Sequence, residues 1–362
     1  MNSERLYFID IVRAFAILMM LQGHFIDTLL SIEYRDISST AFKIWSYFRG
    51  ITAPTFFTIS GLIFTYLLLK AKKKGNEKLR IKKGIIRGFF LIGVGYLLRA
   101  PIFKWLSGKF TTYFLAVDVL QCIGLSLILV ILVYIICFKK NTIFSLSTLL
   151  LGILIFLTEP LYRNLNPENI PLIFSNYISK NNGSVFRIIP WFGYVSLGAF
   201  LATLFFKNLS KNNFKLITII SFIIVGFILI FYSSYLLATI SKLTDIQLFM
   251  DSASYNYLFT RFGNVLLYFA LFYAFENYLK FPLVLKVGQK TLSIYVIHFI
   301  IIYGSFTGYG LNRIIGKTLN PTQALIGAIL FLFIVCFISF YYVKTNAFLY
   351  NNLRKLFDKI KS

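Results

Sequence analysis

The stretch FIDIVRAFAILMMLQGHFIDTLL, residues 8–30, is apolar enough to cross a membrane, yet it holds four ionisable side chains. A charge near the centre of a bilayer costs at least about 2.5 kcal/mol. Because an α-helix has about 3.6 residues per turn, Asp10, Arg13, His24 and Asp27 fall on one face. That face has to meet protein or water, so the stretch predicts a transmembrane helix that lines an interior site.

The composition of the whole chain indicates an integral membrane protein. Of its 362 residues, 58% are hydrophobic and only 14% are charged, whereas a soluble domain carries about 25% charged residues. The net charge of +24 comes from Lys and Arg clustered between hydrophobic runs. This pattern is typical of the cytoplasmic loops of a membrane protein and argues against nucleic-acid binding. The three cysteines lie within apolar runs and form no disulfide or metal-ligand pattern.

Apolar runs of about 20 residues predict an all-α bundle of about ten transmembrane helices. The expected spans are 8–30, 51–69, 84–103, 118–138, 141–158, 186–206, 214–239, 258–279, 291–306 and 322–343. The runs at 141–158 and 291–306 are short, so whether they cross completely stays open. We expect 1–344 to form one transmembrane domain. The segment 345–362 is expected to be a basic tail, either an amphipathic helix on the cytoplasmic membrane surface or a disordered end.

The distribution of Lys and Arg sets the expected orientation. The segment 70–87 holds nine basic residues against one Glu, which marks it as cytoplasmic. Alternation of ten spans then places both termini in the cytoplasm and the loop 159–185 outside. Arg13 lies toward the inner side and His24 toward the outer side. The expected location is the cell membrane (inner or plasma membrane), in which the chain is a multi-pass protein.

Several other polar side chains at membrane depth have a structural explanation. The structural alternatives are an ion pair for Asp10 with Arg13, a head-group contact for Arg87 and for Arg99, and a helix-start cap for Asp118 with Gln121. Both histidines of the chain, His24 and His298, lie within apolar runs. An ionisable group in such a place indicates a functional site.

A histidine with a carboxylate one helical turn away has the parts of a general base. Asp27 can orient the imidazole of His24, whose neutral form takes a proton from a hydroxyl or an amine. His298 belongs to a second polar stripe with Tyr295 and Thr291, and its alternative is a hydrogen-bonded packing role. Two histidines on separate helices make a poor ligand set for a metal, so no metal is expected.

Five motifs together resemble a known family. In chain order they are IDIVRAFAILMMLQGH (9–24), APTFFTISGLIF (53–64), DVLQCIGLSLIL (118–129), RIIPWFGYVSLGAFL (187–201) and VGQKTLSIYVIHFIII (287–302). The set resembles the transmembrane acyltransferase superfamily, that is, acyltransferase family three and the bacterial relatives of heparan-α-glucosaminide N-acetyltransferase. The chain departs from the usual Arg-Gly pair of the first motif by having Ala14 after Arg13.

The resemblance implies a bacterial enzyme that modifies cell-envelope glycans. It would move an acyl group, usually acetyl, from cytoplasmic acetyl-CoA to a hydroxyl or amine of a glycan or lipid-linked sugar. His24 would be the catalytic base with Asp27 beside it, and Arg13 a donor contact with Asp10 and Arg87 nearby. The supporting or substrate-binding positions would be Ser60, Arg99, Asp118, Gln121, Arg187, Trp191, Tyr295 and His298.

The spacing along the first helix agrees with this implication. Eleven residues separate Arg13 from His24, which places them about 16 Å apart on nearly the same face, the order of an extended pantetheine arm. Arg87 or the lysines of 70–87 can hold the phosphates of the donor, although this segment can equally be a plain cytoplasmic loop. The alternative function is a transporter or flippase for an anionic or lipid-linked solute, without acyl transfer. The acceptor, the acyl chain, O- or N-transfer and homo-oligomerisation stay open.

Overall fold

The computed structural model of the chain describes residues 6–167 and 169–361, and the side chains as far as Tyr341. The long helices are α1 (Tyr7–Leu29), α2 (Thr40–Lys73), α3 (Glu77–Arg99), α5 (Val119–Ile136), α6 (Asn141–Leu157), α9 (Ile188–Asn208), α10 (Phe214–Phe227), α11 (Ser233–Thr244), α13 (Tyr257–Ala274), α16 (Thr291–Tyr303) and α18 (Pro321–Lys361). The shorter ones are α4 (Ile102–Leu106), α7 (Glu159–Tyr162), α8 (Leu172–Ile178), α12 (Gln247–Ser254), α14 (Glu276–Leu279), α15 (Pro282–Gln289) and α17 (Leu311–Ile314). Single 3₁₀ or π turns are η1 (Ile32–Tyr34), η2 (Thr112–Leu115) and η3 (Ile228–Tyr232).

The predicted all-α fold is confirmed for the described part of the chain, which contains helices, turns and one isolated bridge between Leu30 and Leu319. Six stretches there are long and apolar enough to cross a membrane. They are Tyr7–Leu29, Thr40–Lys73, Thr112–Ile136, Ile188–Asn208, Phe214–Thr244 and Pro321–Tyr341. The pair α15 and α16, bent by 69°, adds a seventh if it crosses as one broken span. The chain is therefore a multi-pass membrane protein.

Three of the ten expected spans fall on helices outside this set. The span 141–158 coincides with α6, which is apolar but short. The span 84–103 lies on α3, whose first third is rich in Lys and Arg. The span 258–279 begins on α13, where Arg261 and Asn264 reduce the hydropathy. The count of ten spans and the sides of the two termini therefore stay predictions.

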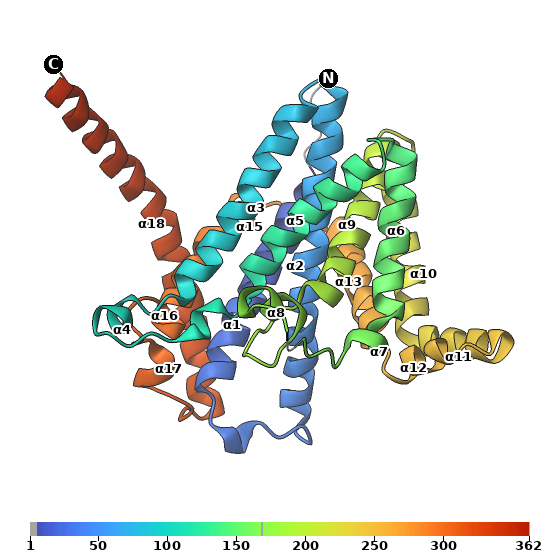
Figure 1. The fold of residues 1–362 in the computed structure, drawn as a ribbon, viewed down its shortest axis with the longest axis horizontal. Helices are drawn as coiled ribbons and strands as arrows, with labels where there is room; N and C mark the ends of the chain where they lie inside the picture. Colours follow the sequence, from blue (N-terminus) through green and yellow to red (C-terminus); the bar gives the residue numbers. More distant parts are fainter. Residues whose placement is uncertain (1–5, 168, 362) are drawn as a thin grey trace.

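Some helix ends differ from those expected. α2 begins at Thr40, well before position 51, so Arg49 belongs to a helix rather than to a loop. The expected span 214–239 passes through the π turn η3 into α11, which pairs with α12 and projects sideways from the lower end of the bundle (Figure 1). α18 runs without a break past position 345, and the apolar face expected for the tail falls on side chains outside the described set.

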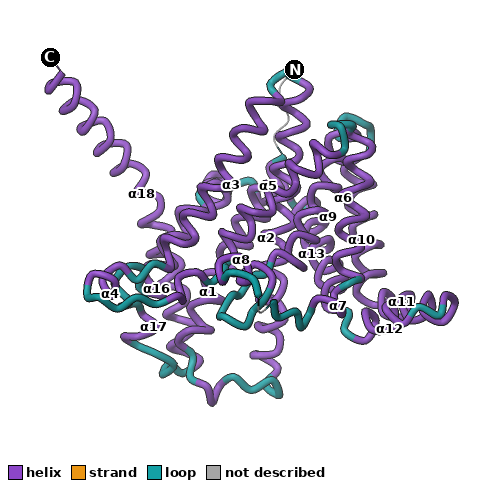
Figure 2. Tube along the Cα trace, viewed as in Figure 1, coloured by secondary structure: helices purple, strands orange, loops and turns teal. Residues whose placement is uncertain are grey.

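Small residues bring α2 and α9 into close contact at the centre of the bundle. A Cβ atom on Gly61 would collide with the backbone carbonyl of Val195, and one on Gly198 would collide with that of Thr58. Glycine at both positions therefore lets the two backbones approach, as small residues do between transmembrane helices. The tube view shows the same helices running side by side through the middle of the molecule (Figure 2).

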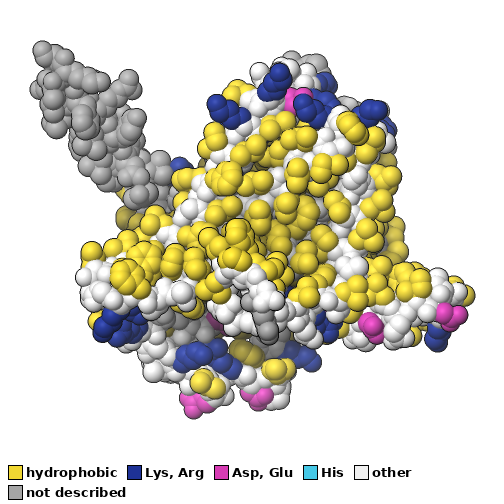
Figure 3. Space-filling model, viewed as in Figure 1, with side chains coloured by type: hydrophobic (Ala, Val, Ile, Leu, Met, Phe, Trp, Pro, Cys, Tyr) yellow, Lys and Arg dark blue, Asp and Glu magenta, His cyan; other side chains and the backbone are white. Residues whose placement is uncertain are grey.

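The surface has the distribution of a protein that sits in a bilayer. In Figure 3 a broad band of apolar side chains crosses the face of the bundle, while Lys and Arg gather at its upper and lower ends. The upper end is where α2 ends and α3 begins (Figure 1). A hydrocarbon layer of about 30 Å fits around such a band.

Candidate functional site

Two cavities lie along α1, one toward each end of the helix. The first, named here the Arg13 cavity, measures about 330 Å³ and presents the polar side chains of Arg13, Ser60, Arg80, Arg87 and Thr291. The second, named here the His24 cavity, measures about 680 Å³ and presents those of His24, Asp27, Arg49, Arg99, Asp118, Tyr257 and Tyr303. Met20, Phe56, Val119 and Tyr295 line both. The polar stripe of α1 therefore faces interior space at two levels, as the sequence predicts.

His24 is held by a residue of α16. Its Nδ1 lies 2.8 Å from the hydroxyl oxygen of Tyr303. When Nδ1–H donates to that oxygen, the lone pair of Nε2 is left free to accept a proton. Both side chains line the His24 cavity, so an imidazole that acts as a base in this tautomer would face a space large enough for a sugar.

Asp27 has a different partner from the one expected. Its carboxylate forms an ion pair with Arg49 of α2, and Arg35 donates to its backbone carbonyl at 2.5 Å. The oxygen bound to Nδ1 of His24 comes from Tyr303 instead. The sequence places Asp27 one turn from His24, but Arg49 approaches from the neighbouring helix and takes up the carboxylate. Asp27 still lines the His24 cavity.

The two histidines of the chain meet in the fold. The rings of His24 and His298 lie edge to face, with their centroids 5.2 Å apart. His298 is completely buried beside Tyr295, whose ring is 4.9 Å away. Neither ring nitrogen of His298 makes a hydrogen bond of good geometry within the described residues. His298 therefore packs behind His24 rather than lining the cavity.

Arg99 and Asp118 form a buried ion pair in the wall of the His24 cavity. Nη2 of Arg99 lies 2.7 Å from Oδ2 of Asp118, and the guanidinium lies over the ring of Tyr113. Asp118 also caps α5 through a capping box with Gln121. The helix-start cap, which was the structural alternative for Asp118 and Gln121, is therefore present. Asp118 also lines the His24 cavity. Gln121 is fully buried, and its Oε1 accepts from the backbone N–H of Asp118.

Arg13 bridges two helices at the floor of its cavity. Its Nη2 donates to Thr291 Oγ1 at 2.7 Å, and its Nη1 lies 3.7 Å from Asp10. Asp10 is buried next to Gly288, where a Cβ atom would collide with the Asp10 carbonyl. The ion pair between Asp10 and Arg13, which was the structural alternative for these residues, is therefore present. It also fixes a guanidinium at the cavity wall.

Two further cations reach the Arg13 cavity from α3. Arg80 and Arg87 both line it, and the Arg80 guanidinium lies over the ring of Phe64. The buried Nε of Arg80 makes no hydrogen bond within the described residues. Ser60 also lines the cavity, although its hydroxyl donates to the Phe56 carbonyl. The three guanidiniums form a donor set suited to phosphate oxygens.

Arg187 and Trp191 lie apart from both cavities. Nη1 of Arg187 donates to the carbonyls of Tyr162 and Arg163 at 3.3 and 2.7 Å, which ties the end of α7 to the start of α9. The ring of Trp191 packs at a tilt against those of Phe57 and Phe186, each at 4.9 Å between centroids. These contacts stabilise the wall behind the His24 cavity without facing it.

The sequence matches the family described as heparan-alpha-glucosaminide N-acetyltransferase, catalytic, over residues 5–239, well over half of the chain. The chain belongs to this family. The family resemblance drawn from the five motifs is thereby confirmed, and the family indicates an acetyltransferase. No curated protein matches the chain.

The family match extends from α1 into α11, so it includes Arg13 and His24 but ends before α16. His298 and Tyr303, which meet His24 in the fold, follow the matched range. Among the residues of the described chain, no group of three His, Cys, Asp or Glu could hold a metal ion.

Sequence reasoning missed Arg49, Arg80 and Tyr303. Arg49 lies just before position 51, where the expected span begins, so the sequence gives it no place on a helix. Arg80 stands in a lysine-rich segment, in which one cation cannot be told from the next. The sequence gives no indication that Tyr303 belongs to the site. It lies five residues after His298 and does not share the helix face of Thr291 and Tyr295.

Proposed function

We propose that the chain transfers an acyl group, usually acetyl, from acyl-CoA on the cytoplasmic side to a glycan or lipid-linked sugar at the other side of the membrane. The observation that carries the proposal is the pair of cavities along α1. One presents guanidiniums for a phosphorylated donor and the other presents an imidazole for an acceptor. The four residues that line both cavities mark the place where donor and acceptor would meet.

Acetyl-CoA suits the Arg13 cavity by its charge and its length. Arg80 and Arg87 would bind phosphate oxygens, and the unpartnered Nε of Arg80 offers a donor for one of them. Arg13 would hold the pantetheine side, since Asp10 already offsets part of its charge. From Arg13 the arm would follow α1 for about 16 Å and place the thioester beside His24.

The proposed reaction needs one base. Nε2 of His24 takes the proton of the acceptor hydroxyl or amine while the acceptor atom attacks the thioester carbonyl. The carbon–sulfur bond then breaks, and the imidazolium returns its proton to the leaving sulfur. Coenzyme A departs as the thiol, and His24 ends neutral. Tyr303 acts as a positioning residue, because it accepts from Nδ1–H and stabilises the imidazolium.

The acceptor would enter the His24 cavity. Its wall combines the ion pairs Arg49–Asp27 and Arg99–Asp118 with the rings of Tyr113, Tyr257, Phe186 and Phe299. Charged groups can hydrogen-bond sugar hydroxyls while aromatic rings cover the apolar faces of a sugar. This mixture supports a carbohydrate rather than an apolar acceptor.

The test compares acetyl transfer and donor binding in His24→Ala and Arg13→Ala. Protein in lipid nanodiscs receives radiolabelled acetyl-CoA and an extract of envelope glycans. We expect His24→Ala to lose about 10²–10⁴-fold in transfer while it still binds coenzyme A. Arg13→Ala should bind coenzyme A more weakly. Gln247→Ala, on the exposed hairpin helix α12, is the control and should behave as the parent.

Two outcomes would contradict the proposal. Full transfer by His24→Ala would exclude His24 as the base. A parent protein that neither binds coenzyme A nor consumes the thioester would exclude acyl transfer, and the transporter or flippase would then be the better assignment.

A further inference from the structure

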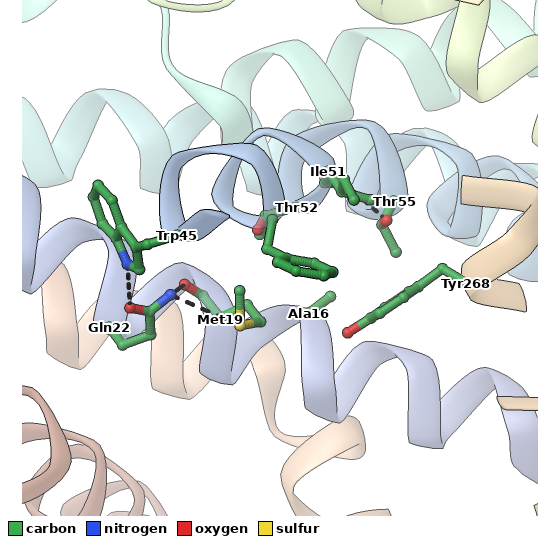
Figure 4. A pocket seen from close by; sticks show the side chains of 9 residues that line it. Ala16, Met19, Gln22, Trp45, Ile51, Thr52, Thr55 and Tyr268 are labelled. Atoms are coloured by element: carbon green, nitrogen blue, oxygen red, sulfur yellow. Dashed lines mark hydrogen bonds between the residues drawn. The ribbon is translucent and has the colours of Figure 1, made fainter. Parts of the chain in front are cut away.

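A third cavity lies on another side of α1, and the proposed reaction does not use it. It measures about 330 Å³ and is bounded by α1, α2 and α13. Its lining is Ala16, Met19, Gln22, Trp45, Phe48, Ile51, Thr52, Thr55 and Tyr268. Figure 4 shows these side chains facing a common space between the two helices, with Gln22 and Trp45 at one end. We name this cavity the α1–α2 groove.

The groove is apolar along its length and polar at one end. The indole N–H of Trp45 donates to Gln22 at 2.8 Å, which satisfies both groups (Figure 4). The hydroxyl of Thr55 donates a hydrogen bond to the backbone carbonyl of Ile51. From Trp45 to Thr55 the groove follows ten residues of α2, about 15 Å. This length is about half the thickness of the hydrocarbon core of a bilayer.

The groove adjoins the His24 cavity through a thin wall. Met19 lines the groove and Met20 the cavity, because consecutive residues of a helix point about 100° apart. Gly23 lies one turn further along α1, between Met19 and Met20 on the helix surface. The aliphatic part of the Arg49 side chain lies against Gly23. Thr52 lines both spaces. The wall is thus a flexible side chain and a threonine rather than packed backbone.

Thr52 differs from its neighbours in one respect. Its hydroxyl oxygen is buried yet makes no hydrogen bond within the described residues, whereas Thr55, Thr58 and Ser60 of the same helix donate to carbonyls four residues back. A buried hydroxyl without a partner costs about 1–3 kcal/mol. An oxygen of a bound molecule that passes from the groove to the cavity could supply the missing partner.

We propose that the α1–α2 groove binds the hydrocarbon chain of a lipid-linked sugar, whose sugar reaches His24 between α1 and α2. The inference rests on the proposed function and selects one acceptor class within it. Both helices are long and apolar enough to cross a membrane, and the groove lies between them. An alkyl chain matches its apolar lining, and the sugar matches the polar wall of the His24 cavity. A free glycan leaves the groove without a role.

The test detects the chain directly and needs no turnover. Dodecyl glucoside with a photoreactive diazirine in its chain is added in trace amounts to nanodiscs of phosphatidylcholine and phosphatidylglycerol, without acetyl-CoA. After irradiation the labelled peptides are identified by mass spectrometry. We expect labelling concentrated on 16–22 and 45–55. Excess unlabelled dodecyl glucoside should compete it away, and added phosphatidylglycerol should not.

Variants locate the label in the groove. Ala16→Phe puts a ring into the groove and should lower labelling of the two peptides by about tenfold or more. Because Ala16 is buried, Met19→Trp at a half-buried position serves as a second filling variant. Gly93→Phe is the matched control, since it adds the same ring to α3 where nothing lies within 4 Å. It should label as the parent does.

The outcomes separate this inference from the proposed function. Labelling spread along the apolar band, or competed equally by phosphatidylglycerol, would assign the groove to bulk lipid and overturn the inference. Labelling unchanged in both filling variants would do the same. A protein that labels as expected but transfers no acetyl group would contradict the proposed function alone.

Discussion

At the scale of single residues, the contact between His24 and Tyr303 makes a prediction that separates two partners for the imidazole. Tyr303→Phe removes the oxygen that lies 2.8 Å from Nδ1. Since such a hydrogen bond contributes about 0.5–1.5 kcal/mol, we expect kcat to fall by up to about tenfold, with KM for acetyl-CoA unchanged. Asp27→Asn should cost less, because Asp27 is paired with Arg49. A greater loss of kcat in Asp27→Asn, measured under the same conditions, would restore Asp27 as the orienting residue.

Also at this scale, the sequence predicts contacts between side chains of the same helix and misses contacts between side chains of different helices. Arg13 and Asp10 are three residues apart, and their ion pair is present. His24 and Asp27 have the same spacing, but Arg49 from α2 binds the carboxylate. The spacing along α1 cannot show whether the Asp27 carboxylate pairs with His24 or with Arg49. The position of Tyr303 depends on how α16 docks against α1, which only the fold decides.

At the scale of elements, the crossing of α2 and α9 makes a prediction about stability. Gly198→Ala would drive a methyl group into the carbonyl of Thr58, and overpacking of this kind costs about 1–3 kcal/mol. We expect the melting temperature in detergent to fall. Gly93→Ala, where nothing lies within 4 Å, should leave it unchanged or raise it, since Ala favours helix more than Gly does. Equal melting temperatures for the two variants would mean that α2 and α9 do not approach as described.

The helices themselves show what apolar runs can predict. Each expected span overlaps a helix of the structure, because hydropathy reports which backbone must form its hydrogen bonds internally. The same signal cannot place a helix end that extends into water, so α2 was expected to start at 51 rather than at Thr40. It also cannot distinguish a spanning helix from one that turns aside. The run 214–239 therefore concealed the turn at η3 and the α11–α12 hairpin.

At the scale of the whole molecule, the two ends of the bundle differ in the way that the proposed function requires. The cavity lined by Arg13, Arg80 and Arg87 lies toward the end where α2 meets α3. The His24 cavity lies toward the end that carries α4, α7 and α8. A donor made in the cytoplasm and an acceptor on the other side would each reach the matching cavity only if the lysine-rich end faces the cytoplasm.

This orientation can be measured in cells. Single cysteines are placed at Lys74 and Asn182, both exposed and in connections at opposite ends of the bundle. An impermeant thiol reagent should label Asn182→Cys in intact cells and both variants after permeabilisation, because the nine basic residues of 70–87 predict a cytoplasmic location for that segment. The parent chain gives the background, which is needed because Cys122 and Cys137 are buried but Cys336 is partly exposed. Labelling of Lys74→Cys alone in intact cells would invert the map, and acyl-CoA of the cytoplasm would then face the His24 cavity instead of the arginines.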